Sequence, residues 1–454
     1  MNSHVPYSRR KFLADCGKAG VLAITVPNIL SSCNRDDRVN LGFIGMGGRA
    51  GSLLKHFILL DKVQVIGITD PFKERMEDRA GWVNNVYTKR MESSDSEVKY
   101  DICKTYDNYE DLLANRKIDA VVIATPDHWH VPLSVAAIKA GKDVYVEKPL
   151  GMTIDQGVTL RKLVHKKNAI LQYGTQQRSD KNFWLAVELT LREKIGKLER
   201  IDAWCPGQNT DYVTSKTPQP IPPGFNYDLW LGPAKKVPYT FDRCKPEGAY
   251  HIYDYAIGFI AGWGAHPLDI AQWGNQADNT SPIEYTGTGT FFSDDSLFDT
   301  INSWDMQCKY ENGVDLHFFS YDKMQDYDAS YLKDVHGHGT TFWGSNGWVS
   351  VDRGSIEVSN PEWLQFTVEP GEELAYKSSH HQQNFIDCVK SRKQPISNID
   401  AAVRSDTICH LGDILIRTGS KKLIWDPVHE DIMNPSTPML RLQQRPQRKP
   451  YDII

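Results

Sequence analysis

The sequence predicts an α/β protein in which a doubly wound parallel sheet is followed by an α+β domain with an open, mostly antiparallel sheet. Three observations support this fold class. Apolar strands alternate with helix-like segments over 39–150, a glycine-rich turn joins the first strand to the first helix, and alternating runs separated by turn residues follow beyond about residue 182. A chain of 454 residues is also too long for a single core, so we expect two main domains.

The leader, residues 1–33, resembles an export signal. Arg9 and Arg10 precede a weakly apolar run over 19–30 that is too short to span a membrane permanently. The arginine pair favours export by the twin-arginine route, and the "LSSC" that ends at Cys33 resembles a lipobox, which would lipidate Cys33. We expect a periplasmic or lipid-anchored protein without a membrane span. The alternative is a leader with a chance arginine pair.

Residues 39–150 carry the pattern of the parallel sheet. The apolar strands "VNLGFI", "VQVIGITD", "DAVVIA" and "DVYV" are separated by helix-like or polar segments. Strands that alternate with helices form right-handed βαβ units, in which the strands run parallel. Ligands bind outside the carboxyl ends of such strands, so the residues that follow each strand are the first candidates for a site.

The second domain is expected over 151–430, followed by a C-terminal extension over 431–454. Its segment 204–239 is rich in Pro, Gly, Asn and Tyr, which is typical of a functional loop over a site. Alternating runs over 283–367 include a hairpin signal at Asn312-Gly313. The segments "HHQQNFIDCVKSRK" and "AAVRSDTICHLGDILIRTG" predict helices that complete an α+β domain.

Composition excludes some classes of function. The net charge is −5, with no basic tract, so we expect no nucleic-acid partner. The eight cysteines are scattered without a Cys-x-x-Cys pair or Cys/His cluster. Neither a structural metal site nor a disulfide framework is therefore expected.

A glycine-rich turn over 45–50 predicts a nucleotide site. The sequence "GMGGRA" fits the pattern G-x-G-x-x-G/A and lies between a strand and a helix. Glycines at this place allow a tight turn and let backbone N–H groups approach a pyrophosphate at the start of the helix, as in the Rossmann fold. The candidate cofactor-binding residues of this turn are Gly45, Gly47, Gly48 and Arg49.

Asp70 ends the next strand and favours NAD over NADP. A carboxylate there can accept hydrogen bonds from both ribose hydroxyls and would repel a 2′-phosphate. Lys73 and Arg75 follow closely and could bind a phosphate instead. NADP therefore stays open as the second choice of cofactor.

Longer motifs point to a family. "ATPDHWHVPLSVAAIKAGKDVYVEKPLG", "NYDLWLGP", "GWGAHPLDIAQWG" and the closing "LIWDP…RKPYDI" resemble the glucose-fructose oxidoreductase/inositol dehydrogenase/rhizopine catabolism (Gfo/Idh/MocA) family, from about Val39 onward. The resemblance implies a Rossmann domain followed by an open-sheet domain that often serves oligomerisation, so we expect a homo-oligomer. It also implies sugars, polyols or their glycosides as substrates, with hydride passing between a ring carbon and nicotinamide.

The resemblance also assigns roles to residues at the strand ends. It implies that Thr125, Pro126 and His130 line the nicotinamide side of the cofactor, and that "EKP", ending at Pro149, is the family signature. Glu147 can hydrogen-bond the nicotinamide ribose. Lys148 can hold a substrate hydroxyl and stabilise the negative charge that develops on its oxygen.

Proton transfer needs a second group. In "GWGAHPLDIAQW", His266 and Asp269 share one face if the segment is helical. An imidazole titrates near neutrality, so we expect His266 to be the general base and Asp269 to orient it or to bind a neighbouring hydroxyl. Well-known family members carry an Asp four residues before this His, where this chain has Gly262. Lys148 with His266, or a residue of the Pro-rich loop, then has a larger share of the proton transfer.

Further candidates for substrate contacts are Gln176 and Arg178, at the end of another strand, and Trp263, which could stack on a sugar ring. Three functions remain open. The first is a dehydrogenase of a sugar or glycoside hydroxyl, for example at the 3-position of a pyranose. The second is an NAD-dependent glycosidase that works by transient oxidation, elimination and re-reduction, with tightly bound NAD. The third is a catalytically silent member that binds ligands.

Overall fold

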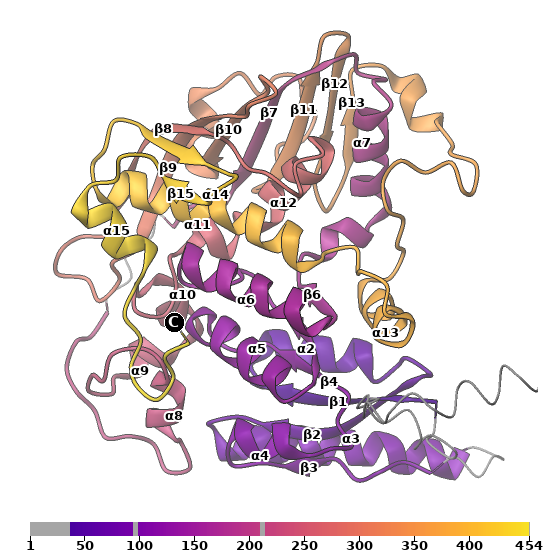
Figure 1. Ribbon diagram of the computed structural model, residues 1–454, viewed down its shortest axis with the longest axis vertical. Coiled ribbons are helices and arrows are strands. Elements are labelled where there is room, and N and C mark those ends of the chain that lie inside the picture. The colour runs from indigo at the N-terminus through magenta and orange to yellow at the C-terminus, as the bar shows by residue number, and fades with distance from the viewer. Residues whose placement is uncertain (1–36, 94–98, 209–213, 454) are drawn as a thin grey trace, which may run out of the picture. The chain divides into compact units, whose positions relative to one another are not determined.

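The computed structural model describes residues 37–93, 99–208 and 214–453. The predicted arginine pair, Arg9 and Arg10, and the predicted lipidation site Cys33 lie outside the described residues. Residues 38–454 form one compact unit (Figure 1). None of the helices in the described part of the chain combines the length and the apolar character that a membrane crossing needs.

The first sheet is parallel, as predicted. Its order in the described residues is β3-β2-β1-β4-β5-β6, and every neighbouring pair is parallel. The strands are β1 (Val39–Ile44), β2 (Val63–Thr69), β3 (Lys104–Thr105), β4 (Ala120–Ile123), β5 (Asp143–Val146) and β6 (Leu171–Tyr173). The sheet extends to Tyr173, so the domain boundary expected at residue 150 falls within its last βαβ unit.

Helices cover both faces of this sheet, which is why its strands are apolar on both sides. The α2 and α3 side chains pack on one face with Leu41 and Phe43, while α4, α5 and α6 pack on the other with Ile44 and Val121. The helices are α2 (Gly48–Phe57), α3 (Lys73–Ser93), α4 (Tyr109–Ala114), α5 (His130–Lys139) and α6 (Ile154–Lys167).

The second sheet is mixed but mostly antiparallel. Its order is β13-β12-β11-β7-β10-β9-β8-β14-β15, and β7 and β10 form its parallel pair among the described strands. The strands are β7 (Leu198–Cys205), β8 (Glu284–Phe291), β9 (Ile301–Lys309), β10 (Asp315–Ser320), β11 (Gly339–Gly344), β12 (Gly347–Val351), β13 (Ile356–Val358), β14 (Leu423–Asp426) and β15 (Asp431–Ile432). The Asn312-Gly313 turn joins β9 to β10, with Gly313 at φ 88°.

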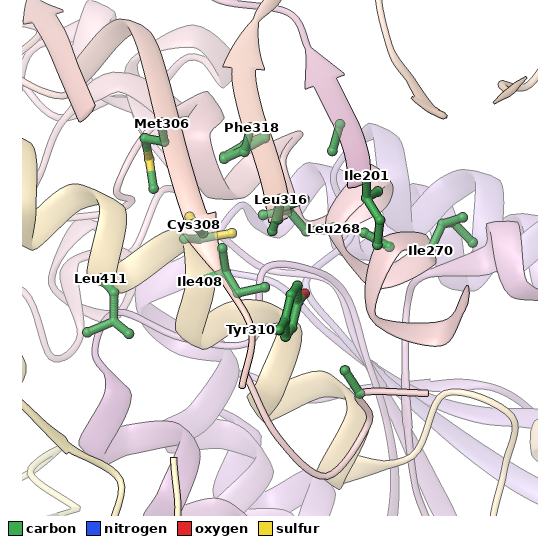
Figure 2. Close-up of a cluster of buried hydrophobic side chains, with 14 of the residues drawn as sticks. Ile201, Leu268, Ile270, Met306, Cys308, Tyr310, Leu316, Phe318, Ile408 and Leu411 are labelled. Atoms are coloured by element: carbon green, nitrogen blue, oxygen red, sulfur yellow. The ribbon is translucent and has the colours of Figure 1, made fainter. Parts of the chain in front are cut away.

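Helices pack on one face of the second sheet and build its core (Figure 2). Leu268 of α12 and Ile408 of α14 belong to the same cluster as Ile201, Met306 and Leu316 of the strands. The remaining helices are α7 (Lys181–Leu191), α8 (Tyr227–Leu231), α9 (Phe241–Cys244), α10 (Pro246–His251), α11 (Phe259–Gly262), α12 (Ala265–Gly274), α13 (His381–Ser391), α14 (Ile399–Arg417) and α15 (Thr437–Gln443), with 3-10 helices η2 (Asp127–Trp129), η3 (Gln176–Ser179), η4 (Tyr321–Asp326) and η5 (Pro361–Gln365).

The second domain contacts the first around the strand ends of the first sheet. Helix α14 lies against α6 (Figure 1), and its Ala402 and Val403 pack in the same cluster as Leu150. The Pro-rich segment lies beside the end of β2, where the Phe225 ring stacks on Phe72 with centroids 3.8 Å apart. The carboxyl ends of the parallel strands therefore face elements of the second domain.

Candidate functional site

A groove of about 310 Å³ lies at the carboxyl ends of β1, β2 and β4. Gly45 begins the turn at φ 82°, and a Cβ there would come within 2.9 Å of the Ala124 carbonyl oxygen. Cβ atoms built on Gly47 and Gly48 would meet nothing within 4 Å. The start of α2 is thus open for close approach by a ligand, which is what binding of a pyrophosphate requires.

Asp70 lies in the wall of this groove and is held by backbone groups. The Met46 N–H donates to its Oδ2 (2.6 Å) and the Phe72 N–H to its Oδ1 (2.8 Å), and burial raises the pKa of Asp70. Oδ2 keeps a further lone pair for a ribose hydroxyl, while Oδ1 also lies 3.6 Å from Arg75 Nη1. Arg75 and Arg79 line the same groove and suit a 2′-phosphate, so the predicted preference for NAD stays a prediction.

The β4 end supplies Thr125 and Pro126 to the groove, whereas His130 does not line it. The His130 ring is 1% exposed, with Nδ1 2.6 Å from the Pro149 carbonyl oxygen and Nε2 2.9 Å from that of Thr125. His130 therefore connects the loops after β4 and β5 instead of lining the cofactor site. This corrects its predicted role.

Glu147 follows β5 and lines a second cavity of about 490 Å³, which shares Arg49 with the groove. Its Oε1 accepts a hydrogen bond from Arg49 Nε (2.8 Å). Because the Arg49 side chain lines both cavities, this buried carboxylate holds the wall that they share. A ligand in the groove and a ligand in the second cavity would meet at this wall.

Lys148 lines the second cavity. Its Nζ donates to the backbone carbonyl oxygen of Gly262, where the family resemblance led us to expect a carboxylate. Burial lowers the pKa of Lys148, while the Glu147 and Asp127 carboxylates oppose this shift. A backbone oxygen thus orients the amine without neutralising its charge.

The sequence prediction missed Asp127, which follows Pro126 in the groove wall. Its side chain is buried, and its Oδ2 has no hydrogen-bond partner within the described residues. Burial raises the pKa of Asp127 to about 8, against the opposing effect of the Lys148 charge. The sequence could have indicated Asp127, because it is the first acidic residue after a predicted parallel strand.

His266 lines the second cavity at the start of α12, beside the Trp263 ring (centroids 5.9 Å apart). Its Nδ1 is buried and has no partner among the atoms that the structure describes. Burial, and then the charges of Lys148 and Arg353, lower the pKa of His266 well below its usual value. The ring is therefore neutral at pH 7, which corrects the expectation of titration near neutrality.

Asp269 and Arg178 lie outside both cavities, which corrects two predicted assignments. Arg178 Nε donates to Asp269 Oδ2 (2.8 Å) and its Nη2 to Asp278 Oδ1 (2.7 Å), and Ser405 also contacts Asp269. A buried guanidinium between two carboxylates is a structural ion pair that holds α12 against η3. Asp269 therefore does not face His266's cavity, although both residues are on one helix.

The other lining residues come from distant segments. Gln176 and Trp263 line the second cavity, and their predicted contacts with a substrate stay predictions. Gln177 lies beside them with both amide atoms buried and unpaired within the described residues. The sequence did not suggest several of the lining residues, among them Asp180, Arg353, His380, His381 and Gln382. Within the described part of the chain, no group of three His, Cys, Asp or Glu side chains has a metal-binding arrangement.

Comparison with known families assigns both domains. Residues 39–175 match the model described as "Oxidoreductase family, NAD-binding Rossmann fold", and residues 207–349 match "Oxidoreductase family, C-terminal alpha/beta domain". Both models belong to the same family.

Curated relatives match a shorter part of the chain. A glycosyl hydrolase family 109 protein from Shewanella pealeana is 31% identical over 159 residues, which is 34% of this chain and 31% of the relative. A protein of the same name from Solibacter usitatus is 32% identical over 121 residues, 26% of each chain. The chain thus matches less than a third of the length of these relatives.

Solved structures share the fold over most of the chain. Myo-inositol 2-dehydrogenase from Lactobacillus plantarum has a TM-score of 0.57 at 18% identity and covers 85% of this chain and 99% of its own. GenD2 from gentamicin A biosynthesis, solved in complex with NAD, has a TM-score of 0.59 at 16% identity, covering 90% and 100%. Aldose-aldose oxidoreductase from Caulobacter crescentus has a TM-score of 0.58 at 14% identity, covering 85% and 99%.

Proposed function

This chain belongs to the Gfo/Idh/MocA oxidoreductase family, and from that premise we propose that it oxidises a hydroxyl group of a sugar, polyol or glycoside with NAD. The observation that carries the proposal is the wall shared by two cavities. The groove has the open glycine turn of a nucleotide site, and the adjoining cavity contains Lys148 and His266. The side chains of Arg49 and Glu147 form their boundary.

The residues of the groove fit a dinucleotide. Gly47 and Gly48 leave space for phosphates at the start of α2, Asp70 lies where a ribose would bind, and Thr125 and Pro126 form the opposite wall. When bound there, nicotinamide would supply the hydride acceptor. The protein's part is to orient the substrate hydroxyl and to handle its proton.

Lys148 and His266 can share that task. The Lys148 amine, fixed by the Gly262 carbonyl oxygen, can donate to the substrate oxygen and stabilise its developing negative charge. The neutral His266 ring can accept the hydroxyl proton, because the residue lines the cavity and burial lowers the pKa of its imidazole. Asp127 faces the same lysine from the groove and, with its raised pKa, can hold a proton near pH 7.

The direct test is turnover with NAD. The purified protein is incubated with a panel of monosaccharides, polyols and aryl glycosides, and the absorbance of reduced nicotinamide is followed. Formation of a keto-sugar with one reduced nicotinamide per product supports a net dehydrogenase. Failure of every compound to reduce bound or added NAD in single-turnover experiments would reject the redox function.

A second candidate is glycoside hydrolysis that restores the cofactor in each cycle. Its support is the name of the curated relatives, which are glycosyl hydrolases. Transient oxidation of a ring hydroxyl acidifies the neighbouring C–H, the aglycone leaves by elimination, water adds, and the hydride returns to the sugar. Aglycone release over many turnovers without added NAD and without net reduction would support this function over the first.

We further propose that the protein is exported by the twin-arginine route with NAD tightly bound. Support comes from Arg9 and Arg10 and from the scarcity of free NAD outside the cytoplasm. A trapped cofactor favours the redox-neutral cycle. Cell fractionation of the wild type and of Arg9→Lys/Arg10→Lys tests the route. A Cys33→Ser variant that stays membrane-associated would argue against lipid anchoring.

We also propose a homo-oligomer that associates through the open sheet of the second domain, as the family resemblance implies. Sedimentation equilibrium of the purified protein tests this. A single species at the mass of one chain over a wide concentration range would reject it.

A further inference from the structure

Arg353 lies in a short loop between β12 and β13, and this loop is held in place. The carboxylate of Asp352 accepts hydrogen bonds from the N–H groups of Gly354 (2.6 Å) and Ser355 (2.9 Å), and its other oxygen lies 2.5 Å from His336 Nδ1. The tip of the second sheet's edge hairpin therefore presents Arg353 on a fixed backbone.

The Arg353 side chain reaches the second cavity without a carboxylate partner. Its guanidinium carbon lies 5.2 Å from the centre of the Trp263 ring, and the residue lines the cavity with Lys148 and His266. Across the residues that the structure describes, no acidic side chain forms an ion pair with Arg353. Arg178 and Arg49, by contrast, are each paired with carboxylates.

The charges around this cavity do not balance. Three cations line it: Arg49, Lys148 and Arg353. Of the two lining carboxylates, Glu147 is bonded to Arg49, and Asp180 caps α7 through the N–H groups of Asn182 and Phe183. The positive charge of Arg353 also lowers the pKa values of Lys148 and His266, after the larger effect of burial. A negative charge in the cavity would relieve these repulsions.

We propose that the substrate sugar carries an anionic group, a carboxylate or a sulfate ester, which Arg353 binds through two N–H···O hydrogen bonds. Guanidinium is suited to this geometry, and the Trp263 ring against which it lies holds it beside the cavity. The inference rests on the proposed function, because it assumes that a sugar hydroxyl binds between Lys148 and His266. It adds that the same cavity selects acidic sugars.

Matched substrates test the selectivity. The probes are 4-nitrophenyl glucuronide and glucoside, the galacturonide and galactoside, in both anomers, and the 6-sulfates of the two neutral sugars. Because Arg353 is exposed and therefore screened by solvent, we expect about a tenfold higher kcat/KM for the preferred acidic member of a pair. Preference for the uronate identifies the carboxylate, and preference for the 6-sulfate identifies the sulfate ester. Equal or better use of the neutral partners would overturn the inference and leave the redox function intact.

Variants tie the preference to Arg353. Arg353→Gln should bring the acidic-to-neutral ratio of kcat/KM close to one, and Arg353→Lys should keep part of it. Arg441→Gln removes an equal charge from the exposed face of α15 and should leave the ratio unchanged. A ratio in Arg353→Gln that equals the wild-type ratio would contradict the assignment.

Two measurements on the wild type do not depend on folding of a variant. Raising the salt concentration should raise KM for the acidic probe and leave KM for the neutral probe nearly constant. If no probe is turned over, equilibrium dialysis with glucuronate, glucose and glucose 6-sulfate separates the two proposals. In that case, preferential binding of an acidic probe supports the charge selectivity even though the redox function is rejected. Equal binding of acidic and neutral probes rejects the charge selectivity as well.

Discussion

The two cavities share Arg49 in their common wall, yet they are lined by different kinds of chemical groups. The nucleotide groove is formed largely by glycines and apolar side chains at three neighbouring strand ends, and residues of 229–250 from the second domain complete it. The second cavity is lined by cations, imidazoles and amides from separate segments of both domains. Backbone and small residues suit a ligand with a constant structure, whereas charged side chains suit the choice of substrate and the chemistry on it. Changes in one cavity should therefore have effects that changes in the other do not have.

The largest difference between the effect on turnover and the effect on nucleotide binding is expected from Lys148→Ala. Loss of the amine removes the donor to the substrate oxygen, so kcat should fall by about 10²–10³-fold. Nucleotide affinity should change little, because Lys148 lines the second cavity and not the groove. Steady-state kinetics and isothermal titration with NAD provide the two readouts. Exposed Lys139→Ala in α5 is the matched control. Near wild-type turnover of Lys148→Ala would remove the amine from the mechanism.

Gly48→Val changes the groove instead, so we expect its main effect on nucleotide binding. The added side chain has no protein atom within 4 Å of its Cβ, so the fold should tolerate it, but it occupies the space at the start of α2. Affinity for NAD should fall at least about tenfold. Gly81→Ala, also with open space around its Cβ, is the control on α3. Unchanged affinity in Gly48→Val, measured by titration calorimetry, would mean that the pyrophosphate does not bind at this turn.

The same difference between the cavities explains what the sequence could predict. The floor of the groove follows from contiguous segments, since a strand, a glycine turn and a helix determine its backbone locally, whereas its side formed by residues of 229–250 depends on packing between the domains. Lys148 could be predicted equally well from the sequence, because it directly follows a parallel strand. Both sheets were predicted for the same reason, from periodic runs and turn residues.

The remaining features of the site could not be predicted, because they depend on contacts between segments that are far apart in the sequence. Spacing on α12 placed His266 and Asp269 on one face, but the packing of η3 brings Arg178 against Asp269 and buries both. Arg353 reaches the cavity through a hairpin of the second sheet, and no local pattern indicates where that hairpin ends. The pKa values of Asp127 and His266 likewise depend on burial, which only the tertiary structure determines.

A smaller effect is expected for Asp127→Asn, through pH-dependent stability. Burial raises the pKa of Asp127 from 3.8 to about 8, so the folded state binds a proton more tightly than the unfolded chain. The contribution of Asp127 is fully present below about pH 4 and is lost as the pH rises through about 8. Asparagine stays neutral, so the variant should lose less stability than the wild type between these pH values, with a difference of about 1 kcal/mol or more at high pH. Parallel Tm curves over this range would contradict the buried, protonated carboxyl.

The smallest effect is expected on the choice between NAD and NADP, at the end of the groove where Asp70 lies. Asp70→Ala should weaken NAD binding by about fivefold, because a ribose would lose its acceptor and the Met46 and Phe72 N–H groups would lose theirs. NADP binding should weaken less or improve, since Arg75 and Arg79 remain in the groove without the carboxylate. Titration of both nucleotides, with Arg75→Gln as the opposite variant, gives the ratio of affinities. If that ratio is the same in Asp70→Ala as in the wild type, Asp70 acts only on the backbone of the turn, and the choice between the two nucleotides depends on other residues.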